Sequence, residues 1–229
     1  MNRRVAVIGL GIFGNEVAVS LAQRGMAVLA LDRDSTLVEA VKDQVDQALI
    51  LDATLESALR EAGLAEISTV VVAIGNQNLE GSILTTALCK QLGVPRIVAR
   101  AVSRLHEQIL RQVGATEVVN PEQEMAQRAA RQIAVPGFRE LFQMSEGVTI
   151  AEIPVPKAFA GKSVLELNIR QKYHVNVIAV RSPGAEAKKG SSPQQEAQVD
   201  LEPSKPLGKN DVLIVVGNEK AINTLSKRN

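Results

Sequence analysis

Three glycines at the spacing G-x-G-x-x-G lie near the start of the chain: Gly9, Gly11 and Gly14. They directly follow the apolar run 5–8, which predicts a buried strand, and a helical pattern begins at Phe13. In this strand–turn–helix context Gly9 permits a tight turn, Gly11 lets the backbone approach phosphate groups, and Gly14 lets the helix pack closely on the strand. The helix N-terminus adds free N–H groups and a partial positive charge. The pattern therefore predicts a site for the phosphates of a nucleotide.

A carboxylate follows at the place where a ribose would be recognised. Asp32 ends the next predicted strand, 27–31, eighteen residues after Gly14. A carboxylate there accepts hydrogen bonds from both ribose hydroxyls and repels a 2′-phosphate. We therefore expect NAD(H) or an unmodified adenosine nucleotide rather than NADP, although the adjacent Arg33 weakens the exclusion.

Side chains that would perform catalysis do not gather into a recognisable pattern. A dehydrogenase needs a general acid or base beside the nicotinamide and a domain that holds the second substrate. The only histidines are His106, expected on a solvated helix face, and His174, expected at a strand edge beside Tyr173. The single cysteine, Cys89, falls inside a helical pattern and is expected to be a small buried side chain. The sequence favours a binding protein over an enzyme, with an NAD-dependent oxidoreductase as the alternative.

Short apolar runs alternate with helical patterns up to about residue 120. The runs that predict strands span residues 5–8, 27–31, 47–51, 69–72, 96–99 and 117–119. The helical patterns between them span residues 13–24, 35–42, 55–62, 78–92 and 105–113. Regular alternation of this kind is typical of right-handed β-α-β units. The sequence therefore predicts an α/β fold with a Rossmann-type, doubly wound parallel sheet.

The pattern changes after residue 120. An N-cap asparagine and a proline open a helix over 120–134, and a shorter helix is expected over 138–144. Phe138, Leu141 and Phe142 form an apolar stripe at helical spacing in this shorter piece. The stripe fits either core packing against a second domain or an exchanged contact in a dimer.

A small α+β domain is expected at the C-terminal end. Its predicted strands span residues 148–153, 175–180 and 212–216, and its predicted helices span 163–167 and 220–225. The segment 182–209 is rich in Gly, Pro, Ser and Gln, which predicts a loop with a flexible tip. The expected organisation is a nucleotide-binding domain over 1–120, linker helices over 121–145, and a small α+β domain over 146–229.

The composition limits the class of protein. Of the 229 residues 45% are apolar but only 2% are aromatic, which suits strands of Val, Ile, Leu and Ala that are buried on both faces. A net charge of +1 gives no electrostatic footprint for nucleic acid, which argues against a redox-sensing transcriptional regulator. The apolar runs are too short to span a bilayer and no signal-peptide pattern follows Met1, so we expect a cytoplasmic protein.

Several short motifs, taken in order, resemble the RCK family, whose two modules are also called TrkA-N and TrkA-C. The first group is 7–14, Leu31-Asp32, Asp52-Ala53-Thr54, Ala73-Ile74-Gly75-Asn76, and Gly114-Ala115 before Asn120-Pro121-Glu122. The second group is 161–164, 167–173 and 211–217. The match spans nearly the whole chain in the family's domain order, and it most resembles the KtrA/KtrC type, a separate cytoplasmic subunit.

The resemblance implies a nucleotide-sensing regulatory subunit that gates a membrane potassium transporter or channel. It implies homodimers that assemble into an octameric ring, docked at the inner face of the cell membrane. Within each dimer the helix after the sheet domain would cross to the partner, before a small RCK-C domain. Two nucleotides would control the pore through their different affinities for two ring conformations.

The resemblance also assigns residues to the nucleotide site. The expected set is Gly9, Gly11, Ile12, Phe13, Gly14, Asp32, Arg33, Asp52, Ala53, Thr54, Ile74, Gly75, Asn76, Arg100 and Glu122. Positions 52–54 would border the adenine, and positions 74–76 would line the crevice where the strand order reverses. Arg100 matches a basic position that faces the phosphates, unless it is a plain surface residue. Glu122 matches a position where some members hold a divalent cation, unless it is an acid that serves a helix N-terminus.

Two features bear on which ligands bind. Relatives often carry Arg directly after the second glycine, where it reaches a terminal phosphate, and this chain has Ile12. ATP, ADP, AMP and NAD(H) therefore all stay candidates, and we expect ATP and ADP to differ less in affinity than in relatives with Arg. In the C-terminal domain, cyclic di-AMP can bind KtrA-type modules. The matching positions are Leu167, Asn168, Arg170 and Ile178, of which Asn168 and Arg170 would otherwise only finish a short helix.

Overall fold

The computed structural model describes residues 4–134, 139–145, 147–182 and 199–226. The chain divides into two compact units, Met1–Glu124 and Met125–Asn229, which we call unit 1 and unit 2. Among the described helices none combines the length and the apolar character needed to cross a membrane.

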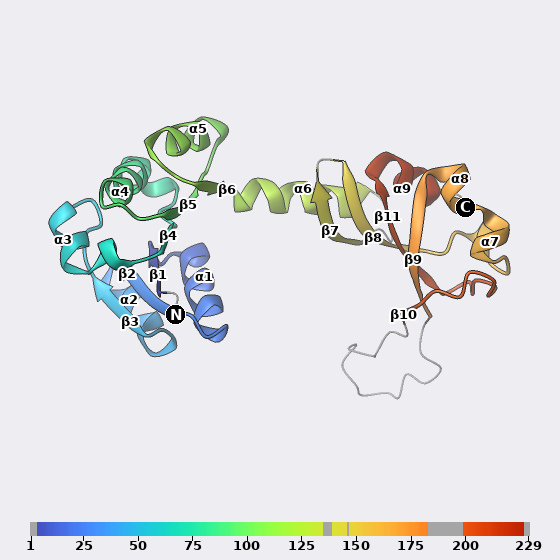
Figure 1. Ribbon diagram of the computed structural model, residues 1–229, viewed down its shortest axis with the longest axis horizontal. Helices are drawn as coiled ribbons and strands as arrows, with labels where there is room; N and C mark the ends of the chain where they lie inside the picture. Colours follow the sequence, from blue (N-terminus) through green and yellow to red (C-terminus); the bar gives the residue numbers. More distant parts are fainter. Residues whose placement is uncertain (1–3, 135–138, 146, 183–198, 227–229) are drawn as a thin grey trace. The chain divides into compact units, whose positions relative to one another are not determined.

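Unit 1 is built on a six-stranded parallel sheet (Figure 1). Its strands are β1 (Arg4–Ile8), β2 (Ala27–Asp32), β3 (Gln47–Ile50), β4 (Thr69–Val72), β5 (Arg96–Arg100) and β6 (Glu117–Val119). They lie in the order β3-β2-β1-β4-β5-β6, so the order reverses between β1 and β4, as in dinucleotide-binding sheets. Every strand ends within one residue of its predicted run, and the predicted fold class is confirmed.

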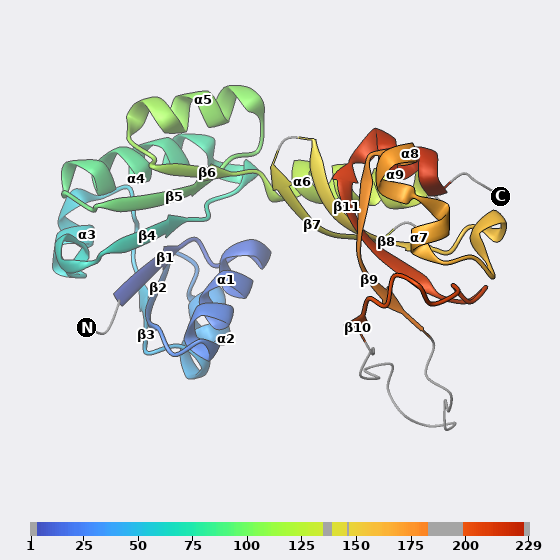
Figure 2. The same cartoon turned by 45° about the vertical axis from the view of Figure 1, so that its right-hand side comes forward.

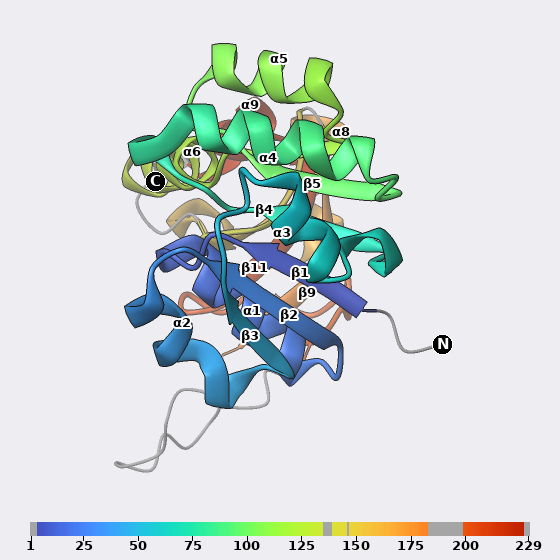
Figure 3. The same ribbon diagram turned by 90° about the vertical axis from the view of Figure 1, so that its left-hand side faces the viewer.

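Helices cover both faces of this sheet, as Figure 3 shows. They are α1 (Ile12–Gln23), α2 (Ser35–Val41), α3 (Glu56–Glu61), α4 (Leu79–Gln91) and α5 (Arg104–Val113), with the short 3-10 helices η1 (Lys42–Gln44), η2 (Leu64–Glu66) and η3 (Asn76–Asn78). Ala18 of α1 and Val38 of α2 belong to one apolar core. Leu59 of α3, Cys89 of α4 and Leu110 of α5 belong to a second core. Because both faces are covered, the strands are continuously apolar rather than alternating.

Helix α6 (Pro121–Ala134) follows β6 directly. The side-chain oxygen of Asn120 accepts a hydrogen bond from the Gln123 backbone N–H at 3.1 Å, so it caps the first turn as expected. The division between the two units falls inside this helix, after Glu124.

Unit 2 is a five-stranded antiparallel sheet with helices (Figure 2). Its strands are β7 (Arg139–Ser145), β8 (Val148–Pro154), β9 (Val175–Arg181), β10 (Val199–Asp200) and β11 (Val212–Asn218), in the order β10-β9-β11-β8-β7. Its helices are η4 (Lys157–Phe159), α7 (Val164–Leu167), α8 (Ile169–Tyr173) and α9 (Glu219–Ser226). Ile153 of β8, Leu213 of β11, Ile169 of α8 and Ile222 of α9 meet in its core. The predicted small α+β domain is confirmed, although α8 follows α7 where one helix was expected.

The short helix expected over 138–144 is wrong. Residues Arg139–Ser145 form strand β7, which pairs antiparallel with β8, while Phe138 lies outside the described residues. Gly147 adopts a φ of 84° between the two strands, a conformation that glycine reaches without strain. Three apolar residues within a stretch of seven are too few for their spacing to separate a helix from a strand. Pairing with β8 therefore decides the local structure, and in the described part of 121–145 a strand follows the helix.

The long segment expected as a loop contributes to unit 2. The flexible tip predicted within 182–209 falls on residues 183–198, which lie outside the described residues. After them β10 pairs with the end of β9, and Leu207 is buried in the core. The second half of the segment is therefore part of the fold.

Candidate nucleotide-binding site

A cleft of about 450 Å³ opens at the carboxyl ends of the strands in unit 1. Ile8 of β1 aligns with Leu31 of β2 and with Val72 of β4, so the loops after these strands emerge side by side where the strand order reverses. Ligands of open α/β sheets bind at such a place. The lining residues are Ile8, Gly9, Gly11, Asp32, Arg33, Asp34, Leu37, Leu51, Asp52, Ala53, Thr54, Ala73, Ile74, Gly75, Gln77, Asn78 and Arg100.

Two of the three motif glycines are required by the protein itself. Gly9 has a φ of +92°, and a Cβ there would lie 2.9 Å from the backbone nitrogen of Ile74. A Cβ on Gly14 would lie only 1.8 Å from the carbonyl oxygen of Gly9. Both glycines therefore allow the turn after β1 to lie against α1 and against the loop after β4.

Gly11 differs, because a Cβ there would meet nothing within 4 Å while the residue lines the cleft. A side chain at this position would occupy the cleft rather than clash with the protein. Gly11 is also the N-cap of α1 and offers no side-chain hydrogen bond, whereas Asp34, Asn78 and Ser103 cap α2, α4 and α5 with theirs. The first-turn N–H groups of α1 thus have no side-chain cap, the arrangement that suits a phosphate.

Asp32 is held rigidly at the end of β2. One carboxylate oxygen accepts a hydrogen bond from the Leu10 backbone N–H at 2.6 Å, and the other accepts one from the Asp34 backbone N–H at 2.9 Å. Each oxygen keeps a further lone pair. The glycine turn and the carboxylate are therefore tied together, and the carboxylate can still accept hydrogen bonds from a ribose.

A second carboxylate, Asp52, is fixed by its neighbour. The Thr54 hydroxyl and the Thr54 backbone N–H both donate to the same Asp52 oxygen, at 2.6 and 2.9 Å. These hydrogen bonds hold the pKa of Asp52 below its ordinary value, so the carboxylate is charged at neutral pH. With Asp32 and Asp34 it outnumbers the one cation, Arg33, that lines this end of the cleft, which disfavours a ligand with a phosphate on its ribose.

Arg100 lies at the end of β5, on another wall of the cleft. A Cβ built on Gly75 would lie 3.3 Å from its Nη1 atom, and its guanidinium lies 5.6 Å from the centre of the Phe13 ring. Its Nη2 atom makes an ion pair with Glu122. Arg100 is therefore a largely buried cation that lines the cleft rather than a plain surface residue.

The structure brings most of the expected nucleotide-site residues together, but not all. Ile12 is 94% exposed and Gly14 is buried against Gly9, and neither lines the cleft. Phe13 and Glu122 reach it only through Arg100. Asn76 opens η3 beside the cleft, and its side chain lies outside the described part of the structure.

Several lining residues were not anticipated from the sequence: Ile8, Asp34, Leu37, Leu51, Ala73, Gln77 and Asn78. Asp34 and Asn78 carry a signal that would have found them, because each is a polar N-cap directly before a helical pattern. Ile8, Leu51 and Ala73 adjoin predicted site residues at the ends of strands, whereas Leu37 reaches the cleft from α2.

The described residues around Glu122 do not form a cation site on their own. No group of three His, Cys, Asp or Glu side chains that could hold a metal ion occurs among the described residues. Glu122, the expected candidate, faces the guanidinium of Arg100 instead.

The positions expected for cyclic di-AMP are spread over α7, α8 and β9. Leu167 is buried in the core of unit 2, so its side chain is not available to a ligand. Asn168 has a φ of 47° between α7 and α8, and its side-chain amide donates to Gln171 at 2.7 Å. Arg170 and Ile178 are exposed.

His106 is buried, and its expected place on a solvated face is wrong. The side chain is 4% exposed and neither ring nitrogen has a hydrogen-bond partner among the described residues. The reason is the spacing with buried Leu110, four residues on, which places both on the inner face of α5. His174 directly precedes β9 and is exposed. Cys89 is buried, and burial raises the pKa of its thiol to about 12, so the prediction of a small buried side chain is confirmed.

Comparison with known proteins places the chain in a family. The TrkA-N domain family matches residues 5–121, and the TrkA-C domain family matches residues 148–228. The Ktr system potassium uptake protein C of Bacillus subtilis (strain 168) is 36% identical over 228 residues, which cover 100% of this chain and 98% of that protein. The Ktr system potassium uptake protein A of the same organism is 30% identical over 221 residues, which cover 96% and 94%.

A solved structure shares the fold of part of this chain. It is the crystal structure of GsuK bound to ADP, with 26% identity and a TM-score of 0.50 over 58% of this chain and 34% of the GsuK chain. The resemblance drawn from the short motifs is thus confirmed by matches over nearly the full length. The chain belongs to the family of proteins with TrkA-N and TrkA-C domains, together with the Ktr system potassium uptake proteins.

Proposed function

We propose that this chain is a regulatory subunit of a membrane potassium uptake system and that it binds an adenine nucleotide in the cleft of unit 1. The observation that carries the proposal is the cleft itself, at the reversal of strand order, in a chain related end to end to Ktr potassium uptake proteins. The relationship supports the transport system, and the cleft supports the ligand.

In the proposed pose the adenosine lies at the acidic end of the cleft. Asp32 accepts hydrogen bonds from the ribose, and residues 52–54 border the base. The phosphates lie on Gly11 and the first turn of α1, with Arg100 as their nearest cation. The relative GsuK is solved with ADP, which supports a nucleoside diphosphate as one ligand. ATP, AMP and NAD(H) share the adenosine and stay predicted ligands.

A binding role suits this cleft better than hydride transfer. No His, Cys or Tyr side chain lines it among the described residues, so the groups that most often serve as a general acid or base near neutral pH are missing from its wall. The hydrogen bonds that lower the pKa of Asp52 also make this carboxylate a weaker base. An NAD-dependent oxidoreductase is the alternative, and it would need a catalytic group from outside this cleft.

The proposed subunit acts at the inner face of the membrane, bound to a potassium transporter or channel. Following the family resemblance, we expect homodimers that assemble into an octameric ring, and nucleotides that act by their different affinities for two ring conformations. Cyclic di-AMP in the C-terminal domain stays a prediction, with Asn168, Arg170 and Ile178 as its exposed candidate contacts. A divalent cation at Glu122 would need ligands from outside the residues that face it here.

Uptake of potassium by cells that lack this chain tests the function. Deleting the gene in its own host should lower the initial rate of rubidium or potassium uptake, and the intact gene should restore it. A copy with Asp32→Ala, made at a normal level, should restore less, because the nucleotide is held less well. Unchanged uptake after deletion, at limiting external potassium, would rule out the proposed role.

A further inference from the structure

Arg100 contacts the cleft and the start of α6 at the same time. Its side chain is only 16% exposed at the end of β5. Nη1 lies alongside Gly75 in the cleft, the guanidinium lies over the ring of Phe13, and Nη2 pairs with Glu122. One cation thus links three segments that are far apart in the sequence.

The guanidinium has hydrogen-bonding capacity to spare. Its Nε atom is buried and has no acceptor among the described residues. A guanidinium presents five donors in a planar fork that matches a phosphate group, and such charge-assisted bonds are stronger than neutral ones. A phosphate in the cleft would therefore be a better partner for Arg100 than the carboxylate of Glu122, which is itself 57% exposed.

Glu122 belongs to the first turn of α6, which continues past the end of unit 1 at Glu124 and on to Ala134 in unit 2. Asn120 caps that turn, with its side-chain oxygen accepting from Gln123 and its carbonyl oxygen accepting from the Glu124 N–H at 3.0 Å. A ligand that takes Arg100 away from Glu122 therefore removes a contact of the first turn of α6.

We propose that Arg100 is shared between Glu122 and a phosphate of the bound nucleotide, so that filling the cleft weakens the Arg100–Glu122 ion pair and loosens the first turn of α6. This inference rests on the proposed function, since it needs a nucleotide in the cleft. It assigns Arg100 as the residue through which the cleft communicates with the helix that leads into unit 2. Coupling is reciprocal, so a nucleotide that weakens the Arg100–Glu122 ion pair is itself bound more weakly, by the same free energy, when the ion pair is present. Removing Glu122 must therefore strengthen nucleotide binding.

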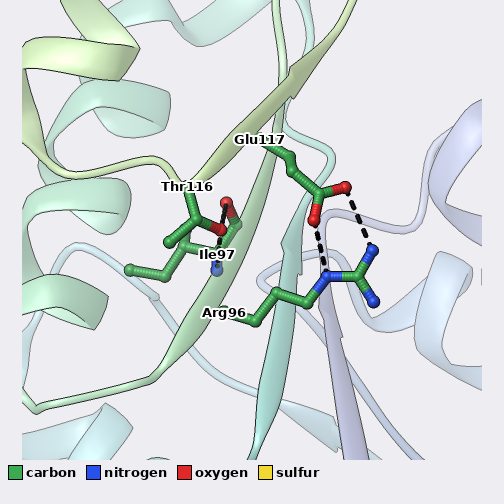
Figure 4. A network of polar contacts seen from close by, with 4 residues as sticks. All are labelled: Arg96, Ile97, Thr116 and Glu117. Carbon is green, nitrogen blue, oxygen red and sulfur yellow. Dashed lines mark hydrogen bonds and ion pairs between the residues drawn. The ribbon is translucent and has the colours of Figure 1, made fainter.

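A second ion pair on the same two strands gives a matched control. Arg96 and Glu117 are the first residues of β5 and β6, whereas Arg100 is the last residue of β5, and they form two hydrogen bonds, at 2.8 and 3.0 Å (Figure 4). Neither residue lines the cleft, and beside them Thr116 exchanges two hydrogen bonds with the Ile97 backbone. Glu117→Gln removes the same charge as Glu122→Gln without touching Arg100.

Calorimetric titration of the full chain with ADP measures how strongly Glu122 competes with the nucleotide for Arg100. Glu122→Gln should bind ADP about twofold to fivefold more tightly than wild type, the size expected for a half-exposed ion pair, and Glu117→Gln should bind as wild type does. Arg100→Gln should weaken binding about tenfold. In the double variant with Arg100→Gln, Glu122→Gln should no longer change the affinity, because the shared cation is gone.

Hydrogen exchange on the full chain gives a readout at α6. Saturating ADP should speed amide exchange at residues 122–125 severalfold in wild type and leave it unchanged in Arg100→Gln. Equal affinities of Glu122→Gln and Glu117→Gln, or a gain from Glu122→Gln that persists without Arg100, would overturn the inference while leaving nucleotide binding intact. If the wild-type chain binds no adenine nucleotide, the proposed function fails and the inference fails with it.

Discussion

At the scale of single residues, the cleft depends on groups that have little freedom. Asp32 is held by two backbone N–H groups from different loops, and Gly9 and Gly14 fill a turn with no room for a Cβ. The sequence predicts these residues because a glycine spacing and a carboxylate after a strand are local patterns. Leu37 and Gln77 could not be predicted in the same way, because they reach the cleft from α2 and η3 only after the sheet has formed.

Substitution by alanine should affect stability at Gly14 and nucleotide binding at Gly11. Gly14→Ala places a Cβ against the Gly9 carbonyl and should lower the free energy of unfolding by about 1–3 kcal/mol. Gly11→Ala meets no protein atom and should change stability by less than about 1 kcal/mol, yet weaken ADP binding because its Cβ occupies the cleft. Urea unfolding and calorimetric titration separate the two effects. Full ADP affinity in Gly11→Ala would show that phosphates do not lie on this turn.

At the scale of elements, the strands of unit 1 follow from sequence because runs of Val, Ile and Ala buried on both faces leave little choice of structure. Strand β7 does not follow, because its short stripe of apolar residues fits two periods and only pairing with β8 decides between them. Helix α5 is predicted in its extent but not in its inner face, where His106 is buried beside Leu110.

His106 should make the stability of unit 1 depend on pH. Burial lowers the pKa of its imidazole below the ordinary 6.5, so the folded protein binds a proton there less readily than the unfolded chain does. The unfolded state then binds more protons as pH falls below about 6.5, and the free energy of unfolding decreases. Between pH 7.5 and 5.5 wild type should lose more of its free energy of unfolding than His106→Leu does.

Urea unfolding at the two pH values measures the difference. The carboxylates are common to both proteins, so their contribution to the pH dependence cancels in the comparison. Asp52, whose pKa is lowered, contributes stability above its unfolded pKa that is lost only in more acidic solution. Identical pH dependence in wild type and His106→Leu would show that the imidazole is not buried in solution.

At the scale of the whole molecule, two units with separate cores are joined through a helix that begins in one and ends in the other. The family match spans both units, and the cleft lies wholly in the first. Any signal from the cleft to unit 2 along the chain has to pass α6, which is why the ion pair at its first turn is informative. The order of the two domains was predictable from motifs, whereas that ion pair depends on side chains from β5 and α6 that no local pattern connects.

Calorimetric titration of the full chain with ADP, ATP and NAD tests the central claim most directly. Wild type should bind ADP saturably, with ATP within about tenfold of it because Ile12 stands in place of an arginine. Asp32→Ala should weaken ADP binding about tenfold or more, since hydrogen bonds to a charged group are lost. Asp46→Ala should not, although Asp46 also accepts a backbone N–H of β2, at 2.9 Å from Val28. No saturable binding of any of the three nucleotides, or equal affinities in the two aspartate variants, would contradict the account.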